Sequence, residues 1–211
     1  MGSGGPFSNS LSGQFLFAPL RALSDFNVSR TFVFSGTWEI PWARKKLWGG
    51  WQLGSILTVT DGLPFTAALS GDVLGQANQL NFDVPNRLAS PGCGRPVNTG
   101  NPLQYINLAC FAFPNPSTLF GNAGRNELIG PGLVNTDVSL FKNFPLRFLS
   151  ESAHLQFRAE AFNFPNRVNY AAPLTNNKLF DTKGNPVNFA GQITTLQTPG
   201  RTMQLGLKLL W

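Results

Sequence analysis

The sequence predicts an all-β fold: an antiparallel transmembrane β-barrel segment of about five to six long strands, an incomplete barrel, with long extracellular loops. Three observations predict it. Several segments alternate apolar and polar residues with a period of two, the pattern of a strand with two different faces. Charged residues make up only 12% of the 211 residues, about half their share in an ordinary globular protein. Two long stretches rich in Gly, Pro and Asn separate the alternating segments.

The hydropathy of the chain is also that of a barrel. The mean hydropathy is −0.04 although few residues are charged. The sequence contains no run of about 18 apolar residues, so no transmembrane helix is expected. A barrel spreads its hydrophobic residues by alternation, which keeps the average low.

The last ten residues show the alternation most clearly. One parity is entirely apolar: Met203, Leu205, Leu207, Leu209 and Trp211. The other parity is polar except for Leu210: Gln204, Gly206 and Lys208. Because alternate side chains of a strand point to opposite faces, this segment has one apolar face. A membrane barrel closes with such a strand, apolar toward lipid and aromatic at the interface.

Four further strands are expected upstream. Residues 31–42 alternate without interruption, with Phe32, Phe34, Gly36, Trp38, Ile40 and Trp42 on one face. Residues 51–60 alternate again, and the pattern resumes on the same parity after residue 64, which predicts one long strand over 51–69 with a kink or bulge. Two more strands are expected over 135–144 and 153–164.

Connection lengths predict the orientation of the strands. Short turns over 43–50 and 145–152 alternate with long, loop-like connections over 71–133 and 165–200. In outer-membrane barrels the short turns are periplasmic and the long loops extracellular. Four of the five tryptophans then fall at the periplasmic edge: Trp42, Trp48, Trp51 and Trp211. This is the place of an aromatic belt, and the alternative is four unrelated core tryptophans.

The expected domain organisation is a flexible N-terminal segment over 1–30, with a possible weak strand over 10–17, followed by barrel over 31–211. The first residues hold no apolar stretch of the kind a signal peptide needs. A single-chain barrel needs about eight strands or more, and an open sheet edge in lipid leaves backbone groups unsatisfied. The sequence therefore predicts the C-terminal part of a larger barrel.

The polar parity of the strands is expected to line the barrel lumen. Its charged and titratable members are Glu39, Asp137, His154, Arg158 and Glu160. Arg158 and Glu160 lie two residues apart, and Asp137 lies on the preceding strand. One interpretation is that these residues contact a ligand or the plug. The preferred interpretation is that they form cross-strand ion pairs in a polar lumen.

The net charge is +6, but its one cluster, residues 44–46, reads as a solvated turn rather than a phosphate-binding patch. We therefore expect no nucleic-acid partner.

Motifs of catalysis and cofactor binding are missing from the sequence. The one histidine, His154, rules out a multi-histidine metal site, and no Gly-x-Ser-x-Gly is present. The glycines of 121–132 do not stand at a strand–helix junction, so no phosphate loop is expected. We expect no enzyme, no cofactor and no metal. A hydrolytic Asp–His pair is the alternative role for His154, and a lumen-lining side chain is preferred.

Cys93 and Cys110 lie in the same long connection. In an oxidising compartment they are expected to form a disulfide that closes a loop of about 18 residues and stabilises it by about 3 kcal/mol. The alternative is two free thiols.

Four stretches resemble TonB-dependent outer-membrane receptors, in particular the Oar-like group with a carboxypeptidase-regulatory-like domain. Residues 25–41 read DFNVSRTFVFSGTWEIP, 50–66 read GWQLGSILTVTDGLPFT, 120–132 read FGNAGRNELIGPG and 156–166 read QFRAEAFNFPN. Residues 135–144 follow the third stretch as they do in that group, and Pro165 departs from its pattern. The resemblance covers most of residues 24–211 in order.

The resemblance implies a barrel of about 22 strands around a plug, energised by the TonB system. Such receptors import scarce ligands: siderophores, cobalamin, carbohydrates or peptides. The implied partners are outer-membrane lipid, the remainder of the barrel and its plug, with the TonB system reached only through the parent protein. The alternative function is a stand-alone small outer-membrane β-barrel, or a surface binding or adhesion protein with long loops.

Overall fold

The computed structural model describes residues 21–41, 49–73, 83–115 and 121–211. The chain divides into two compact units. Unit 1 comprises residues 1–29, 61–132 and 170–195, and unit 2 comprises residues 30–60, 133–169 and 196–211. Among the described residues, no helix has the length and apolar character needed to cross a membrane.

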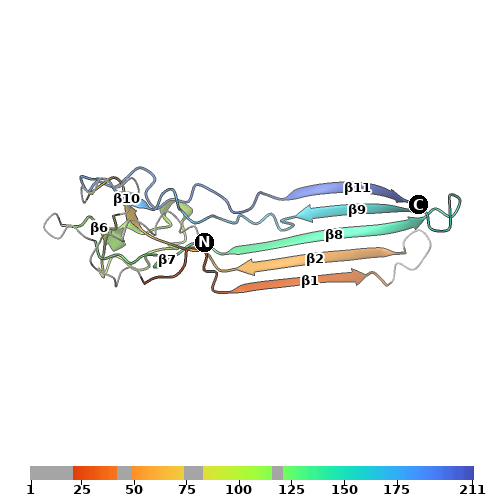
Figure 1. Ribbon diagram of the computed structural model, residues 1–211, viewed down its shortest axis with the longest axis horizontal. Coiled ribbons are helices and arrows are strands. Elements are labelled where there is room, and N and C mark those ends of the chain that lie inside the picture. Colours follow the sequence, from red (N-terminus) through yellow and green to blue (C-terminus); the bar gives the residue numbers. More distant parts are fainter. Residues whose placement is uncertain (1–20, 42–48, 74–82, 116–120) are drawn as a thin grey trace, which may run out of the picture. The chain divides into compact units, whose positions relative to one another are not determined.

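Unit 2 is a single antiparallel sheet of five long strands, which lie side by side in Figure 1. In spatial order they are β1 (Thr31–Glu39), β2 (Trp51–Thr60), β8 (Leu133–Pro145), β9 (His154–Phe162) and β11 (Thr202–Leu210). Each strand coincides with a segment of alternating residues, so the all-β prediction is confirmed. The sheet formed by the described residues is open, with β1 and β11 at its edges.

The register of the strand pairing brings the apolar residues of all five strands onto one face of the sheet. Trp38 of β1 lies opposite Leu53 of β2, and Leu53 lies opposite Leu140 of β8. Leu140 in turn lies opposite Ala159 of β9, and Ala159 lies opposite Leu205 of β11. A shift of one residue in any ladder would move a whole apolar set to the other face.

The prediction of one long strand over 51–69 is wrong. The long strand ends at Thr60, and the chain then enters unit 1 as β3 (Pro64–Phe65) and β4 (Ala68–Leu69). At the departure point a Cβ on Gly62 would lie 1.8 Å from the carbonyl oxygen of Gly130, so the backbones approach more closely than any other residue allows. Phe65 and Leu69 are buried in the core of unit 1, which outweighs the continuing alternation.

Unit 1 contains short elements where the sequence analysis expected loops. They are β5 (Asn86–Arg87), β6 (Phe111–Ala112), β7 (Leu128–Ile129), β10 (Lys178–Phe180) and the 3-10 helices η2 (Pro102–Gln104) and η3 (Leu108–Cys110). β4 pairs with β10, β3 with β7 and β5 with β6. A hydrophobic core cluster lies within this unit, and its members include Phe65, Leu69, Ile106, Leu128 and Leu179. Apart from the alternation over 65–69, the apolar residues of this core were not predicted to pack together from any regular spacing in the sequence.

The strands over 31–42 and 153–164 end earlier than expected, at Glu39 and Phe162. The weak strand over 10–17 and most of the turn over 43–50 lie outside the described residues.

Candidate functional site

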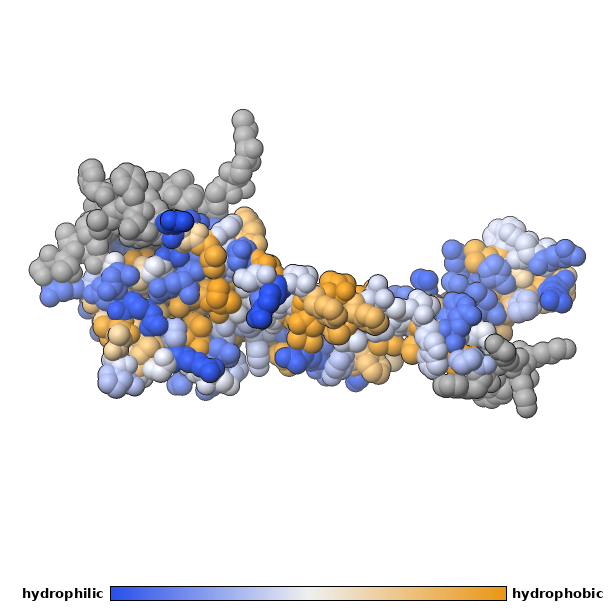
Figure 2. Space-filling view, turned by 90° about the horizontal axis from the view of Figure 1, so that it is seen from below, coloured by the Kyte–Doolittle hydropathy of each residue, from blue (hydrophilic) through white to orange (hydrophobic). Residues whose placement is uncertain are grey.

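One face of the unit 2 sheet is apolar and exposed. Side chains on the edge strands are far from covered: Phe32 is 58% exposed, Leu205 75% and Leu207 69%. In Figure 2, hydrophobic side chains gather along the sheet between polar ones. A soluble protein rarely leaves such a face in water, whereas a barrel wall turns it toward lipid.

Lys142 of β8 shares the parity of the apolar face and is nevertheless buried, with 3% of its surface exposed. Its ammonium lies 5.2 Å from the ring centroid of Trp51 and 4.7 Å from that of Phe144. Both distances are within the range of a cation–π interaction. Sequence analysis did not single out this residue, although a lysine in the apolar parity of a strand is a visible signal.

The described tryptophans of the expected belt lie toward the end of the sheet that carries the short connections. Trp51 begins β2 and makes an edge-on contact with Phe157, with 5.9 Å between ring centroids. Trp211 follows β11 and is 87% exposed. Across the sheet, Trp51 pairs with Lys142, Lys142 pairs with Phe157, and Phe157 pairs with Leu207. Trp211 therefore lies four positions further along the chain than the residue level with Trp51. Such a stagger between strands is what tilted barrel strands produce. Trp42 and Trp48 lie outside the described residues.

The opposite face of the sheet is mostly polar and carries the residues expected in the lumen. Glu39 accepts a hydrogen bond of 3.1 Å from the Gln52 side chain across the β1–β2 ladder. Arg158 and Glu160 form an ion pair of 3.7 Å along one strand, rather than the cross-strand pair that sequence analysis preferred. Glu160 also accepts a hydrogen bond from Gln204.

His154 stands at the first residue of β9, at the opposite end of the polar face from Asp137. Its Nδ1 lies 3.0 Å from the carbonyl oxygen of Ser152. Asp137 bonds instead to two amide groups: its Oδ1 accepts 2.9 Å hydrogen bonds from the Asn135 side chain and from the backbone N–H of Asn163. The structure therefore does not bring this aspartate and histidine together as a hydrolytic pair.

Two adjoining hollows on the polar face share Asp137 and Phe162. The first is completed by Asn135, Asn163, Thr202 and residues 198–200. The second is completed by Ser55, Ile56, Val138, Ser139 and Glu160. We call these two hollows the Asp137 groove. It lies where β2 and β9 end and β8 and β11 begin, at the end of the sheet that carries the long connections.

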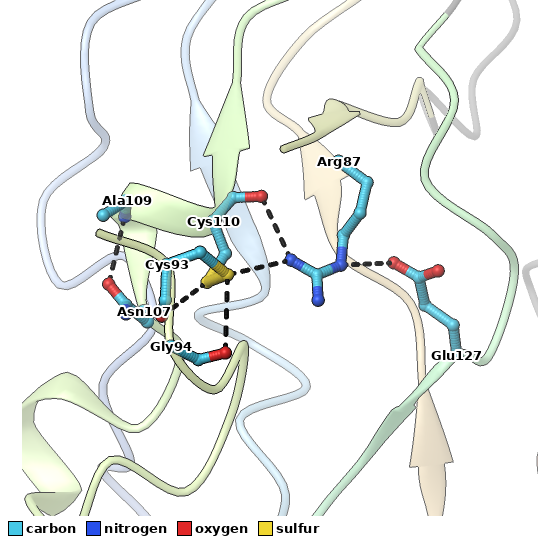
Figure 3. The surroundings of a disulfide bond; sticks show 7 residues. All are labelled: Arg87, Cys93, Gly94, Asn107, Ala109, Cys110 and Glu127. Atoms are coloured by element: carbon cyan, nitrogen blue, oxygen red, sulfur yellow. Dashed lines mark hydrogen bonds and ion pairs between the residues drawn. A yellow bond between two sulfur atoms is a disulfide. The ribbon is translucent and has the colours of Figure 1, made fainter. Parts of the chain in front are cut away.

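Unit 1 contains the disulfide between Cys93 and Cys110 (Figure 3). Their Cα atoms are 4.5 Å apart, and both side chains are buried. The Arg87 guanidinium lies 3.4 Å from the sulfur of Cys93 and donates a 3.2 Å hydrogen bond to the carbonyl oxygen of Cys110. Arg87 also forms a 3.7 Å ion pair with Glu127, so it connects the disulfide loop to a second segment of the unit.

A second polar cluster of unit 1 centres on the buried side chain of Asn126. The backbone N–H of Asn126 donates a 2.9 Å hydrogen bond to Thr66 Oγ1, and this hydroxyl donates a 3.0 Å hydrogen bond to Asn126 Oδ1. The Asn126 Nδ2 donates to the Asp25 carboxylate and to the carbonyl oxygen of Leu23 at 2.8 Å. The Arg125 guanidinium pairs with Asp25 at 3.2 Å. We call these residues the Asn126 cluster.

Among the described residues, no group of three or more His, Cys, Asp or Glu side chains is arranged to hold a metal ion.

Comparison with protein families assigns this architecture. A family model described as an outer membrane beta barrel domain matches residues 2–204. The chain belongs to this family. Its site of action is therefore the outer membrane, and the apolar face of unit 2 is the lipid-facing wall of an outer-membrane barrel. No curated protein and no solved structure matches the chain.

Proposed function

We propose that this outer-membrane barrel domain is the C-terminal barrel portion of a TonB-dependent receptor of the Oar-like group, which imports a scarce ligand. The remainder of the barrel and its plug are the partners of unit 2, and the TonB system acts through the complete receptor. Unit 1 belongs to the extracellular side, where the long connections of such barrels lie.

The observation that carries this proposal is the Asn126 cluster. Three of the four stretches that resemble the Oar-like group supply its members: Asp25 from the first, Thr66 from the second, and Arg125 and Asn126 from the third. Asn126 and Asp25 are 101 positions apart, and Asn126 and Thr66 are 60 apart. Motifs that meet in one buried hydrogen-bond network are specified together by the fold, which makes a chance resemblance of each separate stretch a poor explanation.

The open sheet supports a larger barrel. Among the described residues, β1 pairs only with β2, and β11 pairs only with β9. Each unsatisfied backbone group in lipid costs several kcal/mol, so both edges need further strands. A receptor barrel of many strands supplies them.

The upstream reading frame of the gene tests the proposal. An in-frame extension that encodes a plug and an export signal is the expected result. A stop codon and a ribosome-binding site directly before Met1 would instead support the stand-alone outer-membrane protein, and the receptor proposal would fail. Cross-linking of the complete protein to TonB in intact cells provides an independent check.

We also propose that the domain has no catalytic role and that His154 serves only as a lumen-lining residue. His154→Ala is expected to leave ligand uptake by the complete receptor unchanged, because among the described residues the imidazole hydrogen-bonds only to the neighbouring carbonyl group of Ser152. Uptake rates of the wild-type and variant receptors, normalised to surface-exposed protein, measure this. A loss of ten-fold or more would show that His154 takes part in function.

A further inference from the structure

The Asp137 groove holds a carboxylate for which the described part of the chain supplies no cation. Glu160, the other carboxylate of the groove, is paired with Arg158. Within the described ranges, Asp137 is bonded only to neutral amide groups, and both bonds go to its Oδ1. Arg201 lies in the chain between the groove residues Gly200 and Thr202, but it is bonded elsewhere. Its backbone N–H donates to the Asn166 side chain, and its guanidinium lies 3.4 Å from the carbonyl oxygen of Phe164.

A second acceptor lies beside this carboxylate. Because the Asn135 Nδ2 donates to Asp137, the orientation of the amide is determined and its Oδ1 is the acceptor on the other side. This oxygen is buried and has no hydrogen-bond donor among the described residues. A buried acceptor without a donor is costly, and Asn135 lines the groove, so a donor in the groove would be stabilised once the amide turns toward it. The Asp137 Oδ2 accepts no hydrogen bond from the described residues, so the groove favours a ligand that brings positive charge and an N–H group to this oxygen.

Two apolar side chains flank the carboxylate on this otherwise polar face. Ile56 of β2 lies directly opposite Asp137 in the ladder and is 49% exposed. Phe162 of β9 lines both hollows and is 42% exposed. An aromatic ring beside a carboxylate suits an organic cation, because the ring face attracts the charge while the ring also covers an apolar body.

We propose that the Asp137 groove binds an organic cation, an ammonium or guanidinium group on an apolar body such as a basic peptide carries. The proposal deepens the receptor function, on which it rests, by naming the ligand class that the barrel interior recognises. An anionic ligand would meet the uncompensated charge of Asp137 and be repelled. A bare divalent ion is less suited, because Asp137 and Glu160 are the only two carboxylates among the described residues that line the groove.

Calorimetric titration of the complete protein, as its own gene encodes it and purified from outer membranes in detergent, tests the proposal. The probe is N-acetyl-phenylalanyl-arginine amide, and its neutral match is N-acetyl-phenylalanyl-citrulline amide. We expect the arginine probe to bind about ten-fold more tightly, which corresponds to about 1.4 kcal/mol. Equal affinity of the two probes, or no binding of the arginine probe, would overturn the proposal.

Asp137→Asn should remove the discrimination between the probes, because it removes the charge and keeps an oxygen acceptor for Asn163. Glu39→Gln is the matched control, because it also replaces a carboxylate by an amide on the polar face of the sheet. Glu39 lies in β1, outside the groove, so this variant should change the affinity for neither probe. A similar loss in both variants would count against a local site.

Ile56→Glu provides a second test that does not depend on whether the Asp137→Asn variant folds. It adds a carboxylate opposite Asp137 without disturbing the bonds of that residue, and should tighten the arginine probe several-fold. Unchanged or weaker binding would contradict the proposal.

The outcome separates the two proposals. If the gene encodes no plug, the receptor function fails while charge-selective binding by the groove can still be measured. If the gene encodes a plug and the titration shows no charge selectivity, only the cation site is lost.

Discussion

Tyr105 shows how a single residue joins two parts of unit 1. Its side chain is buried, and its hydroxyl donates a 2.9 Å hydrogen bond to the carbonyl oxygen of Ile129. Burial raises the pKa of Tyr105 from 10.0 to about 12, because the phenolate would lose its hydration. The raised pKa means that the folded unit holds the phenolic proton more tightly than the unfolded chain does.

The sign of the resulting pH dependence follows directly. The stabilisation is complete below pH 10.0 and is lost as the pH rises through about 12. We expect the ultraviolet absorbance of the folded protein to show one tyrosine that ionises only at about pH 12. Tyr105→Phe should remove this last increase in phenolate absorbance. Titration near pH 10.0 of every tyrosine in the folded protein would contradict the burial of Tyr105.

At the scale of one element, β11 tests which face meets lipid. Leu205 and Gln204 are adjacent, and the ladder places them opposite Ala159 and Glu160. Leu205→Arg puts a charge on the apolar face and should destabilise the folded barrel by about 2–4 kcal/mol if the residue lies near the bilayer midplane. Gln204→Arg is the matched control, and it should cost little because the new guanidinium faces the polar side beside Glu160.

Urea unfolding of the complete protein in lipid vesicles measures both variants. If Gln204→Arg destabilises the barrel more than Leu205→Arg, the assignment of the two faces is inverted.

At the scale of the whole molecule, the disulfide and the lipid-facing sheet stabilise different units. Cys93 and Cys110 are 17 positions apart, and in the chain-entropy model a loop of about this length contributes about 3 kcal/mol. The double variant Cys93→Ser and Cys110→Ser should therefore make unit 1 more sensitive to protease and leave the folded barrel sheet of unit 2 intact.

Intact mass with and without reduction, followed by alkylation, checks the bond itself. Two thiols that alkylate freely before reduction would end this prediction.

The elements of unit 2 were predictable because alternation is a local property. The side chains of Thr31–Glu39 or Thr202–Leu210 show two faces whatever surrounds them, and the structure confirms these strands with small changes at their ends. The polar residues Glu39, Asp137, His154, Arg158 and Glu160 share one face for the same reason. Their partners were not predictable, since Arg158 pairs along its own strand and Asp137 bonds to amides.

The sequence by itself determined the strands, their two faces and the two cysteines available for a bond. Only the tertiary structure decided the register that merges five apolar parities into one wall, the departure of residues 61–69 into unit 1, and the meeting of Asp25, Thr66 and Asn126. The physical reason is range. Alternation acts between neighbours in a strand, whereas register and core packing depend on contacts such as Asn126 with Leu23, 103 positions apart.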